Sequence, residues 1–314
     1  MKLIVTIPAY NEEKTITSVI REIPRQIEGI SSVKILILND GSTDNTAQIA
    51  SSAGADFVIS HKQNKGLAIT FKDVIEEALK KGADIIVNTD ADNHYDQSKI
   101  PELIKPILDK KADMVIGSRK IEELDHMPRK NKYGNILGSW LVCKLAGLGK
   151  IDVSSGFRAY TRKAALKMNI LSPHTYTHET LIQAAENKLA IVEVPIKARE
   201  VKRKSKLIKS IPRHIAKSLT VILRVFSLYN FIKIFITLGI VLFIIGVIPI
   251  IRFIYFYFID GGQGHIQSLI IGTMMTLIGF ITIAIALLAS AIDWNRKLIE
   301  DILYRTKKQG LDKK

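Results

Sequence analysis

The sequence predicts an α/β domain with a mostly parallel sheet, followed by an amphipathic helix and a hairpin of two membrane-spanning helices. Strand-like runs alternate with helical patterns early in the chain, two long uncharged segments lie near the C-terminus, and basic residues flank those segments. With 314 residues, 47% of them hydrophobic, the chain can bury a large core, which argues against disorder. Its one cysteine, Cys143, excludes a disulfide scaffold and fits a reducing compartment.

Hydrophobic periodicity identifies the elements of the first domain. Apolar runs typical of strands occupy residues 2–7, 33–39, 56–59, 83–88 and 113–117. Patterns typical of helices lie between them, at 12–23, 44–52, 67–81 and 97–108. Strands that alternate with helices of this length form βαβ units and a parallel sheet. Ligands of such a sheet bind beyond the carboxyl ends of its strands.

An amphipathic helix is expected at 211–229, just before the first uncharged segment. Its apolar residues share one face at helical spacing: Ile215, Leu219, Ile222, Leu223 and Phe226. Such a helix can lie in the membrane interface, or it can pack on the soluble domain.

Two segments are long enough to cross a bilayer. Residues 234–251 carry no charge, the apolar run continues beyond Arg252 to residue 259, and a second uncharged run covers 266–292. About 20 apolar residues span the ~30 Å hydrocarbon core. The loop between the two runs, residues 260–265, has no Lys or Arg.

The net charge of +15 is concentrated beside these segments: residues 197–233 carry +10 and residues 293–314 carry +3, whereas residues 1–196 carry only +2. The positive-inside rule therefore predicts a two-span protein of the cell membrane whose soluble domain and both termini are cytoplasmic. The first apolar run is too short for a signal peptide. A nucleic-acid partner is not expected, because its basic footprint would lie on the folded domain.

These features divide the chain into four parts: a soluble domain at 1–200, a basic linker and interfacial helix at 201–232, two spans within 233–292 (about 233–258 and 266–292), and a basic tail at 293–314.

Polar residues follow three of the predicted strands. They form the segments Pro8-Ala9-Tyr10-Asn11-Glu12, Asn39-Asp40-Gly41-Ser42-Thr43-Asp44 and Asp90-Ala91-Asp92. Asp40 can accept hydrogen bonds from a base or ribose, whereas Asp44 is placed to cap the next helix. Asp90 and Asp92 offer hard oxygens to Mg²⁺ or Mn²⁺, which binds carboxylates together with substrate phosphates.

In this order and spacing, the three segments resemble those of the family 2 glycosyltransferases, whose GT-A fold is a Rossmann-like domain with a mostly parallel sheet. Three further segments resemble the polyprenyl-phosphate branch of that family, which includes dolichyl-phosphate mannose synthases and dolichyl-phosphate glucosyl- and N-acetylglucosaminyltransferases. They are Gly117-Ser118-Arg119, Ser154-Ser155-Gly156-Phe157-Arg158-Ala159-Tyr160 and Tyr176-Thr177-His178-Glu179-Thr180. The resemblance covers about residues 1–230.

The resemblance implies a membrane-anchored enzyme that transfers one hexose from a nucleotide sugar to polyprenyl (dolichyl) phosphate, with inversion at the anomeric carbon. It implies Mg²⁺ or Mn²⁺ held by Asp90, Asp92 and His94, although the branch often has Gln at the position of His94. The positions implied for the nucleotide sugar are Pro8, Tyr10, Asn11, Glu12, Leu38, Asp40, Asp90, Ala91, Asp92 and Arg119.

The implied catalytic positions are Asp92, Arg119, Asp152, Arg158 and Glu179. Asp152 and Glu179 suit a base or a group that orients the sugar, and pairing with Arg158 explains either equally well. A lipid monophosphate, with a second pKa near ~6, is largely dianionic at neutral pH and needs cations more than a base. Candidate cations are Arg129, Lys202, Arg203 and Lys206, which also suit anionic lipid head groups. Hairpin anchors often pack against copies of themselves, so a homo-oligomer is also expected.

Several alternatives stay open at this point. The donor can be UDP-glucose, UDP-N-acetylglucosamine or GDP-mannose, with a weak preference for a UDP-sugar. An enzyme that extends an existing lipid-linked glycan would share these features. A processive polysaccharide synthase is disfavoured, because neither Trp140 nor Trp294 follows an arginine. A basic nucleic-acid-binding or scaffold membrane protein would not explain the strand-end carboxylates.

Overall fold

The structure is a computed structural model, and it describes residues 1–119, 136, 138–140, 142–144, 146–170, 176–196, 199 and 211–312. For residues 211–231 and 260 it describes only the helical backbone. The strands are β1 (Lys2–Ala9), β2 (Ser32–Asn39), β3 (Phe57–Ser60), β4 (Ile85–Asn88), β5 (Met114–Ser118), β6 (Arg158–Thr161) and β7 (Ile191–Pro195). The helices are α1 (Ile16–Glu22), α2 (Thr46–Ser52), α3 (Leu67–Lys80), the short 3₁₀ helix η1 (Gln97–Lys99), α4 (Ile100–Leu108), α6 (Arg162–Lys167), α7 (Thr177–Glu186), α8 (Ile211–Asp260) and α9 (Ile266–Asp312).

The seven strands form one sheet in the order β3-β2-β1-β4-β6-β5-β7. Every neighbouring pair is parallel except those of β6, which runs antiparallel to both β4 and β5. The predicted parallel α/β sheet is therefore confirmed, and all five predicted strands are present. The chain leaves β1 toward β2 on one side and reaches β4 on the other, so the sheet changes direction at β1.

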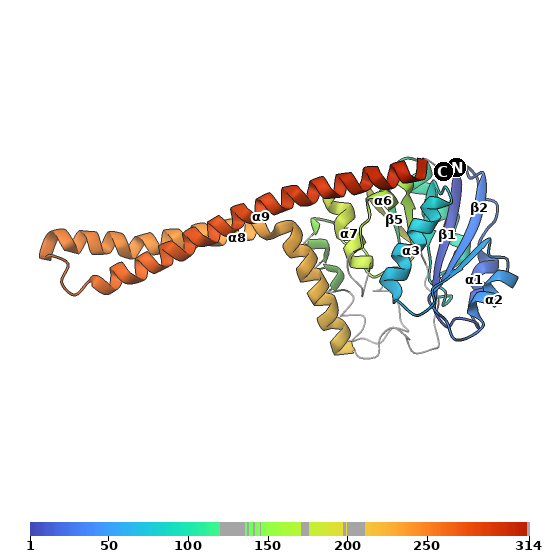
Figure 1. The fold of residues 1–314 in the computed structure, drawn as a ribbon, viewed down its shortest axis with the longest axis horizontal. Coiled ribbons are helices and arrows are strands. Elements are labelled where there is room, and N and C mark those ends of the chain that lie inside the picture. Colours follow the sequence, from blue (N-terminus) through green and yellow to red (C-terminus); the bar gives the residue numbers. More distant parts are fainter. Residues whose placement is uncertain are drawn as a thin grey trace. The chain divides into compact units, whose positions relative to one another are not determined.

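Helices cover both faces of this sheet (Figure 1). Strand β1 alternates: Leu3, Val5 and Ile7 belong to a core cluster with the apolar faces of α1 and α4, while α3 packs against β1 and β2 from the other side. Helix α1 begins at Ile16 rather than at the predicted residue 12, because the preceding residues form a loop in which Asn11 has a φ of +56°. The N-cap of α2 is Asn45 rather than the expected Asp44; Asp44 precedes it and accepts a hydrogen bond from the N–H of Thr46, the first residue of the helix.

Two long apolar helices follow the domain. The candidate membrane spans are Ile232–Ile259 in α8 and Ile266–Leu311 in α9, and only 11% of the most apolar window of each is buried. Core helices of soluble proteins are mostly buried, so length, composition and exposure all fit helices that cross a membrane. The predicted amphipathic helix and the first predicted span form one helix, α8, and the predicted basic tail is helical as far as Asp312.

The chain separates into two compact units: Met1–Leu223 with Tyr304–Lys314, and Arg224–Leu303. Within the second unit, glycines bring the backbones of α8 and α9 into contact at two levels. A Cβ on Gly246 would lie 2.5 Å from Thr276 Oγ1 and 2.9 Å from Gly272 O, and one on Gly239 would lie 3.0 Å from Gly279 O. Small residues permit this approach where lipid removes the hydrophobic driving force between helices.

Replacing Gly246 with Ala should destabilise the hairpin, because the added Cβ also meets the backbone nitrogen of Thr276. Overpacking of this kind costs roughly 1–3 kcal/mol. Unfolding of the full chain in mixed detergent micelles measures the change. Gly310→Ala is the matched control, since nothing lies within 4 Å of a Cβ there. Equal stability of the two variants would contradict the packing described.

Candidate active site

Hydrogen bonds join the loops that follow β1 and β2. The N–H of Asn11 donates to Ser42 Oγ at 2.9 Å, and Asn11 Oδ1 accepts from the N–H of Thr43 at 2.8 Å. Asn11 is in the left-handed region, which Asn adopts more readily than most residues. Its neighbour Tyr10 is 39% exposed, and Glu12 is buried, with its N–H on Thr46 Oγ1 at 2.8 Å. The two loops thus form one surface beyond the ends of two adjacent strands.

Asp40 lies at this surface directly after β2 and is only 3% exposed. Its carboxylate accepts hydrogen bonds from His61 Nδ1 at 2.8 Å and from the N–H groups of Lys65 and Gly66, each at 2.9 Å. Burial raises the pKa of Asp40, but these hydrogen bonds outweigh burial and leave the pKa below its ordinary value. Asp40 is therefore ionised at neutral pH.

Asp90 and Asp92 follow β4, on the other side of β1. The pKa of Asp90 is raised to about 7: burial and, next, repulsion from Asp92 raise it, while Arg119 and Arg158 oppose the rise. Gly156 packs directly against the Asp90 carboxylate, since a Cβ on Gly156 would lie 3.0 Å from both carboxylate oxygens. A cation bound between Asp90 and Asp92 would offset this repulsion and stabilise the ionised form of both carboxylates.

A metal site built from protein ligands alone is not found in the described part of the chain. No group of three or more His, Cys, Asp and Glu side chains is placed there to hold a metal ion. The expected set of Asp90, Asp92 and His94 is therefore not assembled: the His94 N–H donates to Asp92 Oδ1 at 3.1 Å, and its ring packs edge-on against Tyr95. Two carboxylates completed by substrate phosphates still fit Mg²⁺ or Mn²⁺.

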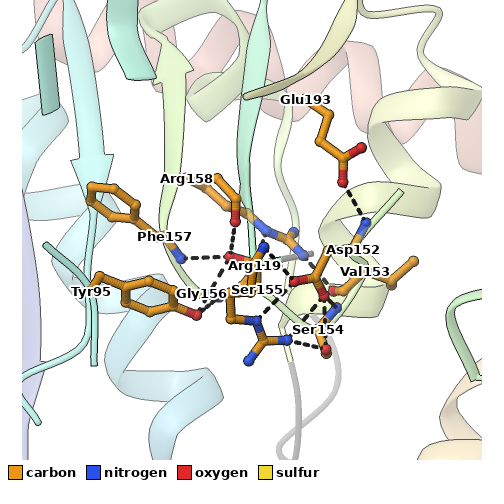
Figure 2. Close-up of polar contacts among 11 residues, drawn as sticks. Tyr95, Arg119, Asp152, Val153, Ser154, Ser155, Gly156, Phe157, Arg158 and Glu193 are labelled. Carbon is orange, nitrogen blue, oxygen red and sulfur yellow. Dashed lines mark hydrogen bonds and ion pairs between the residues drawn. The ribbon is translucent and has the colours of Figure 1, made fainter. Parts of the chain in front are cut away.

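Arg119, which follows β5, forms a two-pronged ion pair with Asp152 (Figure 2). Nε donates to Oδ2 at 2.8 Å and Nη2 donates to Oδ1 at 3.0 Å. The N–H of Asp152 in turn donates to Glu193 Oε1 at 2.8 Å. Burial raises the pKa of Asp152, but its hydrogen bonds and ion pair with Arg119 lower it below the ordinary value. Among the described residues none accepts a hydrogen bond from Nη1.

Arg158 and Glu179 lie deeper than the sequence suggested. Arg158 is fully buried, and it donates to the carbonyl oxygens of Val153 and Ser155 at 2.6 and 2.8 Å. It also reaches Thr180 Oγ1 at 3.0 Å, which ties the loop before β6 to α7. Glu179 is 2% exposed in the first turn of α7. Asp152 pairs with Arg119 and not with Arg158, so the ion pair considered from the sequence forms with a different arginine.

The remaining predicted positions are distributed as follows. Pro8 and Leu38 are register partners in β1 and β2, and Ala91 is buried between the two aspartates. Arg129, Lys202, Arg203 and Lys206 lie outside the described residues.

Two buried tyrosines near Asp90, Tyr95 and Tyr176, were not identified as site residues from the sequence. The N–H of Gly156 donates to Tyr95 Oη at 3.0 Å, and Asn88 Nδ2 donates to Tyr176 Oη at 3.1 Å. Tyr176 also stacks on Phe71 with ring centroids 3.8 Å apart. Both tyrosines adjoin polar motifs in the sequence, which could have indicated them. Tyr95 is the third residue after Asp92, and Tyr176 begins the segment that ends at Thr180.

A mostly parallel sheet with paired carboxylates and a clamped arginine at the carboxyl ends of its strands defines a transferase of the GT-A type. The sequence profile described as Glycosyl transferase family 2 matches residues 4–168, more than half of the chain. The chain belongs to glycosyltransferase family 2 and is a glycosyltransferase.

Named relatives agree with this assignment, and a solved structure shares the fold. The chain is 35% identical over 213 residues to the UDP-N-acetylglucosamine–dolichyl-phosphate N-acetylglucosaminyltransferase of Methanococcus voltae, covering 61% of this chain and 83% of that protein. It is 33% identical over 205 residues to the dolichyl-phosphate hexose transferase of Haloferax volcanii, covering 65% and 86%. Glucosyl-3-phosphoglycerate synthase of Mycobacterium tuberculosis, solved with Mn²⁺, UDP and phosphoglyceric acid, shares the fold with a TM-score of 0.57 at 20% identity, covering 72% of this chain and 78% of that one.

Gly156→Ala should reduce transfer about 100-fold, because the Cβ would press on both Asp90 oxygens and on Tyr176 Oη, and displacements near 1 Å cost about that factor. Steady-state rates in detergent measure the loss, with circular dichroism as a check on folding. Gly138→Ala, where nothing lies within 4 Å, should keep full activity. Full activity of Gly156→Ala would show that the position of Asp90 does not matter for transfer.

Asp152→Asn should both unfold more easily and react more slowly. Removing one partner of a buried ion pair costs roughly 3–5 kcal/mol, and a misdirected Arg119 should lower the rate about 100-fold. Chemical denaturation and the transfer rate provide the two readouts. The control Glu102→Gln breaks an exposed pair with Lys99 (2.6 Å) and should change neither. Unaltered stability of Asp152→Asn would show that the pair does not organise the site.

Proposed function

We propose that the chain is a membrane-anchored enzyme that transfers one hexose from a nucleotide sugar to polyprenyl (dolichyl) phosphate at the cytoplasmic face of the membrane. One observation carries the proposal: Asp90, Asp92 and the clamped Arg119 occur in a chain that continues into two apolar helices long enough to cross a membrane. Relatives named as dolichyl-phosphate transferases support the acceptor, as does the undecaprenyl-phosphate mannosyltransferase of Micrococcus luteus, 27% identical over 206 residues.

The donor is assigned to the carboxyl ends of β1, β2 and β4. The surface joined by Asn11 and Ser42 would hold the nucleoside, and Asp90 and Asp92 would face the diphosphate. The full set proposed for the nucleotide sugar is Pro8, Tyr10, Asn11, Glu12, Leu38, Asp40, Asp90, Ala91, Asp92 and Arg119. Asp90 and Asp92 would hold Mg²⁺ or Mn²⁺, which when bound offsets charge on the leaving nucleoside diphosphate. Arg119 Nη1 would bind the same diphosphate, with Asp152 fixing the guanidinium plane.

The acceptor chemistry needs little help from a base. A phosphate oxygen of the lipid attacks the anomeric carbon as the bond from that carbon to the nucleoside diphosphate breaks, which inverts the centre. The attacking oxygen carries no proton, because a phosphate monoester with a second pKa near ~6 is dianionic at neutral pH. The lowered pKa of Asp152 suits an orienting role, since that carboxylate is a weak base. Arg129, Lys202, Arg203 and Lys206 are proposed to bind the lipid phosphate.

A contact at the end of α9 supports two crossings of the membrane. Lys307 Nζ donates to Met168 O at 3.1 Å and to Asn169 Oδ1 at 2.9 Å, and Tyr304–Lys314 belong to the same compact unit as the catalytic domain. The two ends of the hairpin then lie on one side, and the basic flanks favour the cytoplasmic side. Association of hairpins from different copies stays a prediction.

Membranes that contain the full chain should move label from a nucleotide sugar into the organic phase when polyprenyl phosphate is added. UDP-glucose, UDP-N-acetylglucosamine and GDP-mannose are compared in parallel. EDTA should abolish transfer and excess Mg²⁺ or Mn²⁺ should restore it, because the metal offsets the leaving charge. Label found only in longer lipid-linked glycans would favour the extension reaction and overturn the proposed acceptor.

Asp92→Ala should lower this transfer at least about 100-fold, since a residue that holds charge in the transition state contributes on that scale. Asp109→Ala, at the exposed end of α4, is the matched control and should be fully active. If Asp92→Ala transferred the sugar at the wild-type rate with EDTA present, the proposed metal dependence would be wrong.

A further inference from the structure

The loop of residues 61–66, between β3 and α3, folds onto the end of β2. Gly41, with a φ of +66°, permits this contact: a Cβ there would lie 2.5 Å from the carbonyl carbon of Gln63 and 2.6 Å from the nitrogen of Asn64. Because the obstructing atoms are backbone atoms, no side-chain rotation could relieve the clash. The loop is therefore built to lie against Asp40 and Gly41.

This loop occupies most of the hydrogen-bonding capacity of Asp40. Oδ1 accepts from His61 Nδ1 at 2.8 Å and from Lys65 N at 2.9 Å, and Oδ2 accepts from Gly66 N at 2.9 Å. A carboxylate has about four acceptor positions, two on each oxygen. Thr70, which also approaches the carboxylate, directs its single proton to Gly66 O at 2.9 Å. At most one acceptor position remains for a ligand, on Oδ2.

His61 is held rigidly by a second carboxylate. Its side chain is only 8% exposed, and Nε2 lies 3.0 Å from Asp73 Oδ2. Asp40 and Asp73 therefore contact opposite nitrogens of the same ring. Asp73 thereby fixes the ring plane and keeps the Nδ1–H on Asp40.

We propose that His61, together with the amides of Lys65 and Gly66, makes Asp40 selective for a base that offers one hydrogen-bond donor, which means uracil over guanine. Uracil presents N3–H alone between two carbonyl groups, and one position on Oδ2 satisfies it. Guanine presents N1–H and N2–H side by side and needs both carboxylate oxygens, but Oδ1 is filled. The inference rests on the proposed function, in which Asp40 belongs to the nucleotide-sugar site; it assigns Asp40 to the base rather than the ribose and names UDP-sugars as the donor class.

The test measures dissociation constants of UDP and GDP for the full chain in detergent with Mn²⁺ and no lipid acceptor. The wild type should bind UDP about tenfold or more tightly, since an unpaired buried donor carries a penalty of that size. His61→Ala frees a position on Oδ1 and should reduce the UDP/GDP ratio at least about threefold, mainly by improving GDP binding. His61→Gln keeps one donor for Oδ1 and should retain the selectivity. Lys62→Ala, at the exposed neighbour of His61, is the matched control.

Equal affinity of the wild type for UDP and GDP would overturn the inference, and so would an absence of binding to either. A parallel loss of both affinities in His61→Ala would show a merely structural role. If His61→Ala does not fold, loss of selectivity in His61→Gln contradicts the proposal and retention supports it. Because no lipid is present, a chain that selects UDP yet fails to label polyprenyl phosphate would refute the proposed acceptor and leave this inference standing.

Discussion

A fully buried arginine, Arg158, joins the loop before β6 to the start of α7 in the candidate site. Its guanidinium binds carbonyl oxygens of the loop before β6 and a hydroxyl at the start of α7, and the described residues give it no direct carboxylate partner. A desolvated cation is costly unless it is fully hydrogen-bonded and near negative charge. Asp90 supplies that charge at longer range, and in return Arg158 opposes the rise in the pKa of Asp90. A rearrangement of the loop that carries Gly156 would move the carbonyl oxygens that Arg158 contacts.

The parallel part of the fold could be predicted because strands β1 to β5 are apolar runs bounded by turn residues, a local signal. Strand β6 was missed since it has four residues and begins with Arg158, whose burial no local pattern indicates. Strand β7 was missed for the opposite reason: it lies at the edge of the sheet, half-exposed, and its residues alternate weakly. Gly239 and Gly246 are seven residues apart, a spacing that places both on one face of a helix and is typical of close helix contact.

Of the candidate site, the sequence indicated which strand ends carry chemistry but not which groups satisfy one another. Asp90, Asp92 and Arg119 were identified, yet the clamp on Arg119 joins residues 33 apart, and His61 reaches Asp40 across 21 residues. Such pairings depend on how the chain crosses the sheet, which a motif does not encode. The structure places Asp152 on Arg119 and Arg158 on backbone carbonyl oxygens, while the catalytic roles expected for these residues and for the strand-end carboxylates stay predictions.

The antiparallel placement of β6 has a consequence for its pairing with β5. Since β5 and β6 run in opposite directions, the chain leaves the sheet at Arg119 and returns near Asp152 at the same edge, and the ion pair between them closes this excursion as a cross-link would. The entropy of closing a loop grows only logarithmically, by about 0.6 kcal/mol for each doubling of its length. A change in the length of this excursion therefore adds little closure entropy to the pairing of the strands on either side. The ion pair thereby makes the pairing of β5 with β6 largely independent of the number of residues between them.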